Sequence, residues 1–84
     1  METSADKTKA ERLTEGIRIL KKLRDFGVQS HDIGQKEIQA TITKWVNDGE
    51  PIKEKIWIPR IGRDADMDLT SKKGETAVLV LRAQ

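Results

Sequence analysis

The period of the apolar residues changes once along this chain, near Gly49, and this change constrains the fold more than any other feature. Before it, Ile38, Ile42 and Trp45 recur every three or four residues, which places them on one face of a helix. Beyond Pro51, apolar and charged residues alternate as in a half-buried strand. The sequence therefore predicts an α+β fold in which two helices precede a small antiparallel sheet of two or three strands.

Local signals give approximate bounds for the two helices. Thr8 and Glu11 have the spacing of a capping box, in which each residue satisfies a backbone N–H of the other. We expect the first helix to run from Thr8 to Phe26, with Gly27 in the left-handed conformation that commonly ends helices. A second helix is expected over about residues 32–48, with Asp32 and Gln35 as a second possible capping pair.

The first predicted helix is apolar over about half of its circumference, and Gly16 lies inside that arc. Because a glycine in mid-helix costs about 1 kcal/mol relative to alanine, we expect another helix or the sheet to approach closely there. The predicted core draws on every element and consists of Ile17, Leu20, Ile38, Ile42, Trp45, Ile56, Ile58, Leu79 and Leu81.

Two or three strands are predicted after the break: one over residues 52–61, one over residues 76–82, and residues 64–69 as a candidate middle strand. Turns are expected at residues 62–63 and 71–74, and Pro59 indicates an edge or a bulge in the first strand. The first and third strands carry apolar residues on both faces, and two helices cannot cover both faces of a sheet. This excess predicts self-association or a protein partner, with an interface formed by Trp57, Ile61, Val78 and Val80.

Length and composition limit the class of protein. With 84 residues the chain has room for one domain, predicted over residues 8–84 behind a flexible tail of residues 1–7. The absence of cysteine excludes disulfides and thiolate metal sites. No secretory signal and no membrane-spanning run is evident, so we expect a cytoplasmic protein without membrane contact.

Motifs for catalysis and metal binding are weak. The single histidine, His31, lies in a connector, and no phosphate loop, dinucleotide fingerprint or nucleophile elbow is present. The spacing of Asp64, Asp66, Asp68 and Glu75 resembles an EF-hand loop, but the position that needs glycine is Leu69. We therefore expect a protein that is not an enzyme and has neither a cofactor nor a metal site.

The order of helices followed by a hairpin resembles the winged-helix arrangement, which contacts DNA with one helix and a basic hairpin. The formal net charge of +2 is compatible with an anionic partner. The sequence thus predicts a small binding protein whose partner is DNA or RNA. The alternative is a protein-interaction or homo-oligomeric module that uses the apolar sheet face. The residues predicted to contact nucleic acid are Lys36, Gln39, Lys44, Arg60, Arg63, Lys72 and Lys73.

Overall fold

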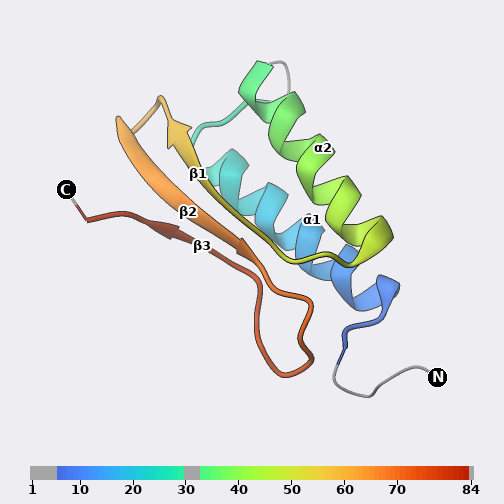
Figure 1. Cartoon of the computed structure of the whole chain (residues 1–84). Coiled ribbons are helices and arrows are strands. Elements are labelled where there is room, and N and C mark those ends of the chain that lie inside the picture. The colour runs from blue at the N-terminus through green and yellow to red at the C-terminus, as the bar shows by residue number, and fades with distance from the viewer. Residues whose placement is uncertain (1–5, 30–32, 84) are drawn as a thin grey trace.

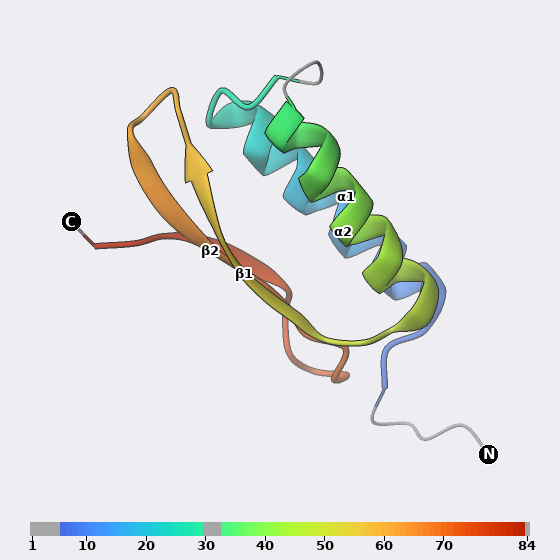
Figure 2. The ribbon, with the colours of Figure 1, turned by 45° about the horizontal axis from the view of Figure 1, so that its top comes forward.

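A computed structural model describes residues 6–29 and 33–83 and shows two helices packed against one face of an antiparallel sheet (Figure 1). The sheet has three strands in the order β1-β2-β3. In Figure 2, α2 lies on the side of β1 and α1 on the side of β3. The predicted α+β fold is confirmed. Its elements are α1 (Lys9–Asp25), α2 (Ile33–Asp48), β1 (Ile52–Ile58), β2 (Arg63–Leu69) and β3 (Val78–Leu81).

The predicted capping box begins α1. The Thr8 hydroxyl accepts from the Glu11 backbone N–H at 3.1 Å, and Glu11 Oε1 accepts from the Thr8 backbone N–H at 2.9 Å. The hydrogen bond from the Thr8 backbone N–H, followed by the Thr8 side chain and the nearby Lys73 ammonium, holds the pKa of the Glu11 carboxyl below its usual value. The lowered pKa means that the ionised Glu11 carboxylate stabilises the folded state. This stabilisation is fully present above the unfolded-state pKa and is lost as the pH falls through the lowered folded-state pKa. Gly27 follows the helix with φ of 93°. The second predicted capping pair includes Asp32, which lies outside the described residues.

The first strand is shorter than predicted. It ends at Ile58 rather than at Ile61, because Pro59 has no N–H for the ladder and begins a turn instead. The turn closes at Gly62, where φ is 61° and where the N–H donates to the Ile58 carbonyl at 2.9 Å. β1 and β2 then pair from Ile58 opposite Arg63 to Ile52 opposite Leu69.

The core lies between the helices and the inner face of the sheet. Six of the nine predicted core residues are buried, and Leu20 and Leu81 pack against them at the periphery. Ile17 was predicted wrongly, since half of its surface (50%) is exposed. The sheet and α2 enclose the side of α1 that carries Ile19 and Leu23. Ile17 faces away from that side, because it lies about 200° around the helix from Ile19.

Gly16 lies at a close contact between the two helices, where the sequence predicted that another helix or the sheet would approach. A Cβ atom added there would lie 2.9 Å from Ile42 Cγ2 and 3.4 Å from Val46 Cγ2. The first distance is shorter than carbon atoms tolerate, so glycine permits this packing.

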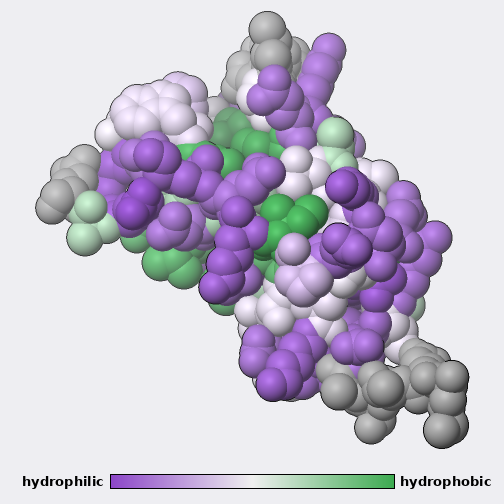
Figure 3. All heavy atoms as spheres, in the orientation of Figure 1, coloured by the Kyte–Doolittle hydropathy of each residue, from purple (hydrophilic) through white to green (hydrophobic). Residues whose placement is uncertain are grey.

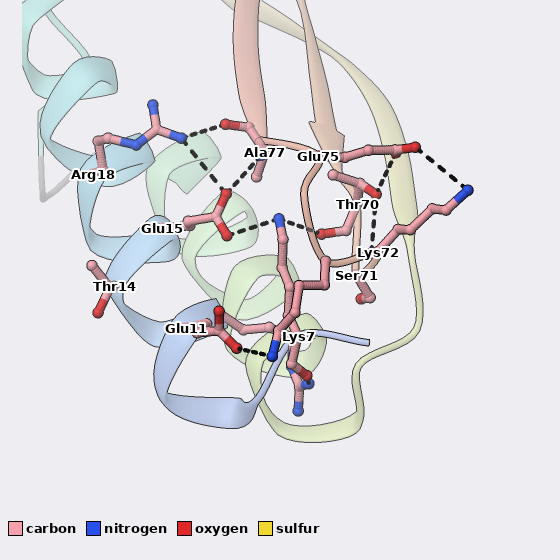
Figure 4. A network of polar contacts seen from close by, with 12 residues as sticks. Lys7, Glu11, Thr14, Glu15, Arg18, Thr70, Ser71, Lys72, Glu75 and Ala77 are labelled. Carbon is pink, nitrogen blue, oxygen red and sulfur yellow. Dashed lines mark hydrogen bonds and ion pairs between the residues drawn. The ribbon is translucent and has the colours of Figure 1, made fainter. Parts of the chain in front are cut away.

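Two residues of the predicted tail are anchored on the sheet. The Lys7 backbone N–H donates to the Ser71 carbonyl at 2.8 Å, and Asp6 forms a bridge with Lys72. The Lys7 side chain is buried, with Nζ 2.7 Å from Glu15 Oε2 and 3.0 Å from the Thr70 carbonyl oxygen (Figure 4). The folded part of the chain therefore begins at least two residues before the predicted boundary at residue 8.

Removing the Lys7 charge alone should strongly destabilise the protein. Lys7→Met leaves Glu15 in a mostly buried site without its ammonium partner, and its remaining cation is the partly exposed Arg18 guanidinium at 3.9 Å. We expect a loss of about 3 kcal/mol in the free energy of unfolding. The double variant Lys7→Met with Glu15→Gln should be more stable than the sum of the single losses predicts, because no unpaired charge remains. Urea unfolding of the four proteins in this cycle measures the difference. Additive losses would contradict the role assigned to the ion pair.

Two glycine substitutions should change stability in opposite directions. Gly16→Ala should destabilise the protein by about 1 kcal/mol, because the overpacking against Ile42 outweighs the gain in helix propensity. Gly34→Ala should stabilise it by about 0.5 kcal/mol, because an added Cβ at position 34 meets no atom within 4 Å. Thermal unfolding followed by circular dichroism distinguishes the two, and equal shifts would show that the helices do not approach as described.

Candidate interaction surfaces

The structure distributes the predicted nucleic-acid residues over three places. The β1–β2 turn lies where α1 ends, since Arg60 packs over Gly27. The β2–β3 connection lies at the other end of the sheet, beside the start of α1 (Figure 1). The three groups are Lys36, Gln39 and Lys44 on α2, Arg60 and Arg63 at the β1–β2 turn, and Lys72 and Lys73 in the β2–β3 connection.

Several of these cations already have partners within the chain. Lys72 lies 4.0 Å from Glu75 and Lys73 lies 3.7 Å from Glu11. Arg63 is half-buried and donates to the Arg82 carbonyl. The basic residues at the turns therefore do not combine into one basic surface. Nucleic-acid binding stays a prediction.

The outer face of the sheet is exposed but not continuously apolar. Trp57 on β1 and Val80 on β3 are 58% and 55% exposed, and Ile61 at the turn is 38% exposed. Between them β2 presents a stripe of aspartates, and Figure 3 shows hydrophilic atoms over the middle of the sheet with hydrophobic atoms over β3. The predicted interface residues are thus separated by an acidic strand. Its aspartates are Asp64, Asp66 and Asp68.

The acidic stripe has the geometry of a strand and not of an EF-hand loop. Asp66 lies opposite Lys55, Asp68 lies opposite Lys53, and Asp66 is also 3.5 Å from Arg82. Within residues 6–29 and 33–83, no three acidic or histidine side chains are grouped closely enough to hold a metal ion. Asp66 and Asp68 thus lie opposite lysines, an arrangement of opposite charges that favours strand pairing, whereas Asp64 lies opposite Trp57.

The outer edge of β3 is covered by polar side chains from α1. The Ala77 N–H donates to Glu15 Oε1 at 2.7 Å, and Arg18 donates to the Ala77 carbonyl (Figure 4). Lys22 donates to the Leu79 carbonyl at 2.9 Å. Side chains one helical turn apart thus bind the backbone groups that an added strand would need, which blocks pairing at this edge.

The outer edge of β1 is open. The Arg82 N–H bonds the Asp64 carbonyl, so even-numbered residues of β2 bond to β3 and odd-numbered residues bond to β1. The register then turns the N–H and C=O groups of Lys53, Lys55 and Trp57 away from the sheet. In the part of the chain that the structure describes, no group bonds to them. β1 therefore offers a row of free backbone donors and acceptors.

A groove of about 460 Å³ runs beside this open edge, between β1 and the first turns of α2. Its apolar lining comes from Val28, Ile38 and Ile56, and hydrophobic atoms are visible between the sheet and α2 in Figure 3. Gln35 also lines the groove, and its Oε1 is buried without a hydrogen-bond partner. A free strand edge, an apolar groove and an unpaired acceptor thus occur together.

The sequence reasoning missed this site. The alternation of Lys53, Glu54 and Lys55 is typical of an edge strand and was the available signal. The groove itself depends on how α2 packs beside β1, which no local pattern indicates. His31, the single histidine of the sequence, lies outside the described residues.

Comparisons with protein-family models, with curated proteins and with solved structures gave no match. In the described part of the chain, no helix combines the length and the apolar character needed to cross a membrane.

The nucleic-acid prediction has a direct test. If DNA or RNA is the partner, fluorescence anisotropy of labelled duplex and single-stranded oligonucleotides should show binding at low salt that weakens steeply as salt is added. Because the basic groups lie apart, charge reversal at Lys36 and Lys44 should remove binding through α2, whereas reversal at Arg60 and Lys72 should remove binding through the turns. Absence of binding at low salt would contradict the prediction.

Proposed function

We propose that this chain is a non-enzymatic protein-binding module that takes an extended segment of a partner as an additional strand on β1. The observation that carries the proposal is the contrast between the two edges of the sheet. The edge of β3 is covered by Glu15, Arg18 and Lys22, whereas the edge of β1 is free and has a groove beside it. Strand addition of this kind draws its affinity from backbone hydrogen bonds and its specificity from alternate side chains.

The lysines of β1 indicate the chemistry of the added strand. Along the edge that faces β2, β1 already pairs with a strand whose aspartates lie opposite Lys53 and Lys55. An added strand places its own alternate side chains beside the same two lysines, on the outer face of the sheet. Acidic residues at these alternate positions are therefore favoured.

The remaining side chains of the added strand point toward the groove. Its floor is formed by Ile38 and Ile56, so an apolar side chain fits there. Glu37 and Glu54 also line this side, which disfavours acidic residues facing inward. The expected ligand is a segment in which acidic and apolar residues alternate.

The β1 strand of a second copy is a poorer ligand. Edge-to-edge pairing of two β1 strands would bring four lysines, one Lys53 and one Lys55 from each copy, onto one face of a joined sheet. No acidic residue would lie between them. The homo-oligomer predicted from the sequence stays a prediction for other surfaces.

A labelled peptide with the sequence of residues 62–70, which contains β2, is a suitable probe because it carries the expected alternation. We expect it to bind the whole protein, and we expect a peptide with asparagine in place of each aspartate to bind several-fold more weakly, because the pairs with Lys53 and Lys55 are lost. Fluorescence anisotropy measures both affinities.

Two variants separate strand addition from general attraction. Trp57→Pro removes an outward N–H that the ladder does not use and leaves the charge of β1 unchanged, and Gly34→Leu fills the groove at a position with free space. Both should abolish peptide binding while the thermal midpoint stays near that of the wild type, and Gly34→Ala should bind normally. Wild-type affinity in both variants would overturn the proposal.

A further inference from the structure

The side of the helix pair that faces away from the sheet forms a second groove, of about 330 Å³, between α1 and α2. Leu13 and Ile17 line it from α1 and are 51% and 50% exposed, with Leu20 partly buried beside them. Gln39 and Thr43 line it from α2. The sequence assigned Ile17 and Leu20 to the core, and the fold leaves Ile17 half-exposed in this groove.

The rim of this groove is cationic. Lys9 lies one turn before Leu13, Lys21 one turn after Ile17 and Arg24 one turn after Leu20, and Lys36 lies one turn before Gln39 on α2. Across residues 6–29 and 33–83, none of these four cations is in an ion pair, unlike Lys7, Lys72 and Lys73. No acidic residue lines the groove. The surface therefore combines exposed apolar side chains with unpaired positive charge.

The backbone of the two helices favours a helical occupant. Their N–H and C=O groups are bonded within the helices, so an extended segment in this groove would leave its own backbone groups unpaired. A helix satisfies its backbone internally and needs only side-chain contacts. From Lys9 to Leu20 the groove follows α1 for about 17 Å, which corresponds to about three turns of a helix.

We propose that the groove between α1 and α2 binds an acidic amphipathic helix of a partner protein. Apolar residues at i, i+4 and i+7 would contact Leu13 and Ile17, and flanking glutamates or aspartates would lie beside the cationic rim. A second copy of this chain is excluded as the preferred occupant, because its groove carries the same cations. A nucleic acid would use the cations but would leave Leu13 and Ile17 exposed.

The test uses the whole protein and a labelled 18-residue peptide of Leu, Ala and Glu, with leucine at helical spacing on one face. A peptide of the same composition in scrambled order is the matched control. We expect the amphipathic peptide to bind at least tenfold more tightly than the scrambled one. Binding should weaken more than tenfold in the double variant Leu13→Gln with Ile17→Gln, and also in Lys9→Glu with Lys21→Glu. Leu13 and Ile17 are half-exposed and glutamine is a good helix former, so the thermal midpoint should change little.

Four results would overturn the inference. Equal binding of the scrambled peptide, or unchanged binding in Leu13→Gln with Ile17→Gln, would show that the contact is electrostatic only. If duplex DNA binds the same cations and its affinity does not fall in the double glutamine variant, the surface is assigned to nucleic acid. Concentration-dependent dimerisation in light scattering that the glutamine variant abolishes would assign it to a second copy. Gly34→Leu blocks the β1 groove and should leave this binding unchanged, so failure at one site is distinguishable from failure at the other.

Discussion

The buried Lys7 ammonium joins α1, α2 and the segment that follows β2 at one point. It binds Glu15 of α1 and the carbonyl of Thr70, and it lies 5.9 Å from the ring of Trp45 in α2. Beside it, the indole N–H of Trp45 donates to the Ser71 hydroxyl at 2.8 Å. In so small a domain the apolar core leaves little stability in reserve, and losing one partner of a buried pair is costly. The arrangement of helices on the sheet therefore depends on this contact.

Glu15 links that contact to the binding surfaces. One carboxylate oxygen accepts from Lys7 and the other from the backbone of Ala77, so the residue that neutralises the buried lysine also covers the edge of β3. With Arg18 and Lys22 it leaves β1 as the open edge of the sheet. Under the proposed function, α1 would therefore determine the edge to which a further strand adds.

The two proposed sites differ in what they offer to a partner. The β1 groove presents unpaired backbone groups and suits an extended segment, whereas the groove between the helices presents only side chains and suits a helix. Both favour acidic partners, through Lys53 and Lys55 in one case and through Lys9 and Lys21 in the other. The mild positive charge of the sequence, interpreted at first as a sign of nucleic acid, is equally compatible with acidic protein segments.

The sequence by itself determined the local structure: the change of period gave the order of elements, the Thr8–Glu11 capping box and Gly27 bounded α1, and Gly16 indicated a close helix contact. These features depend on neighbours within a few residues or on a steric requirement of one residue. Only the tertiary structure decided that Lys7 is buried, that Ile17 is exposed and that β1 rather than β3 has the open edge. Each of these depends on contacts between residues far apart in the chain, such as Lys7 with Thr70 and Lys22 with Leu79, and hydrophobic periodicity carries no information about such contacts.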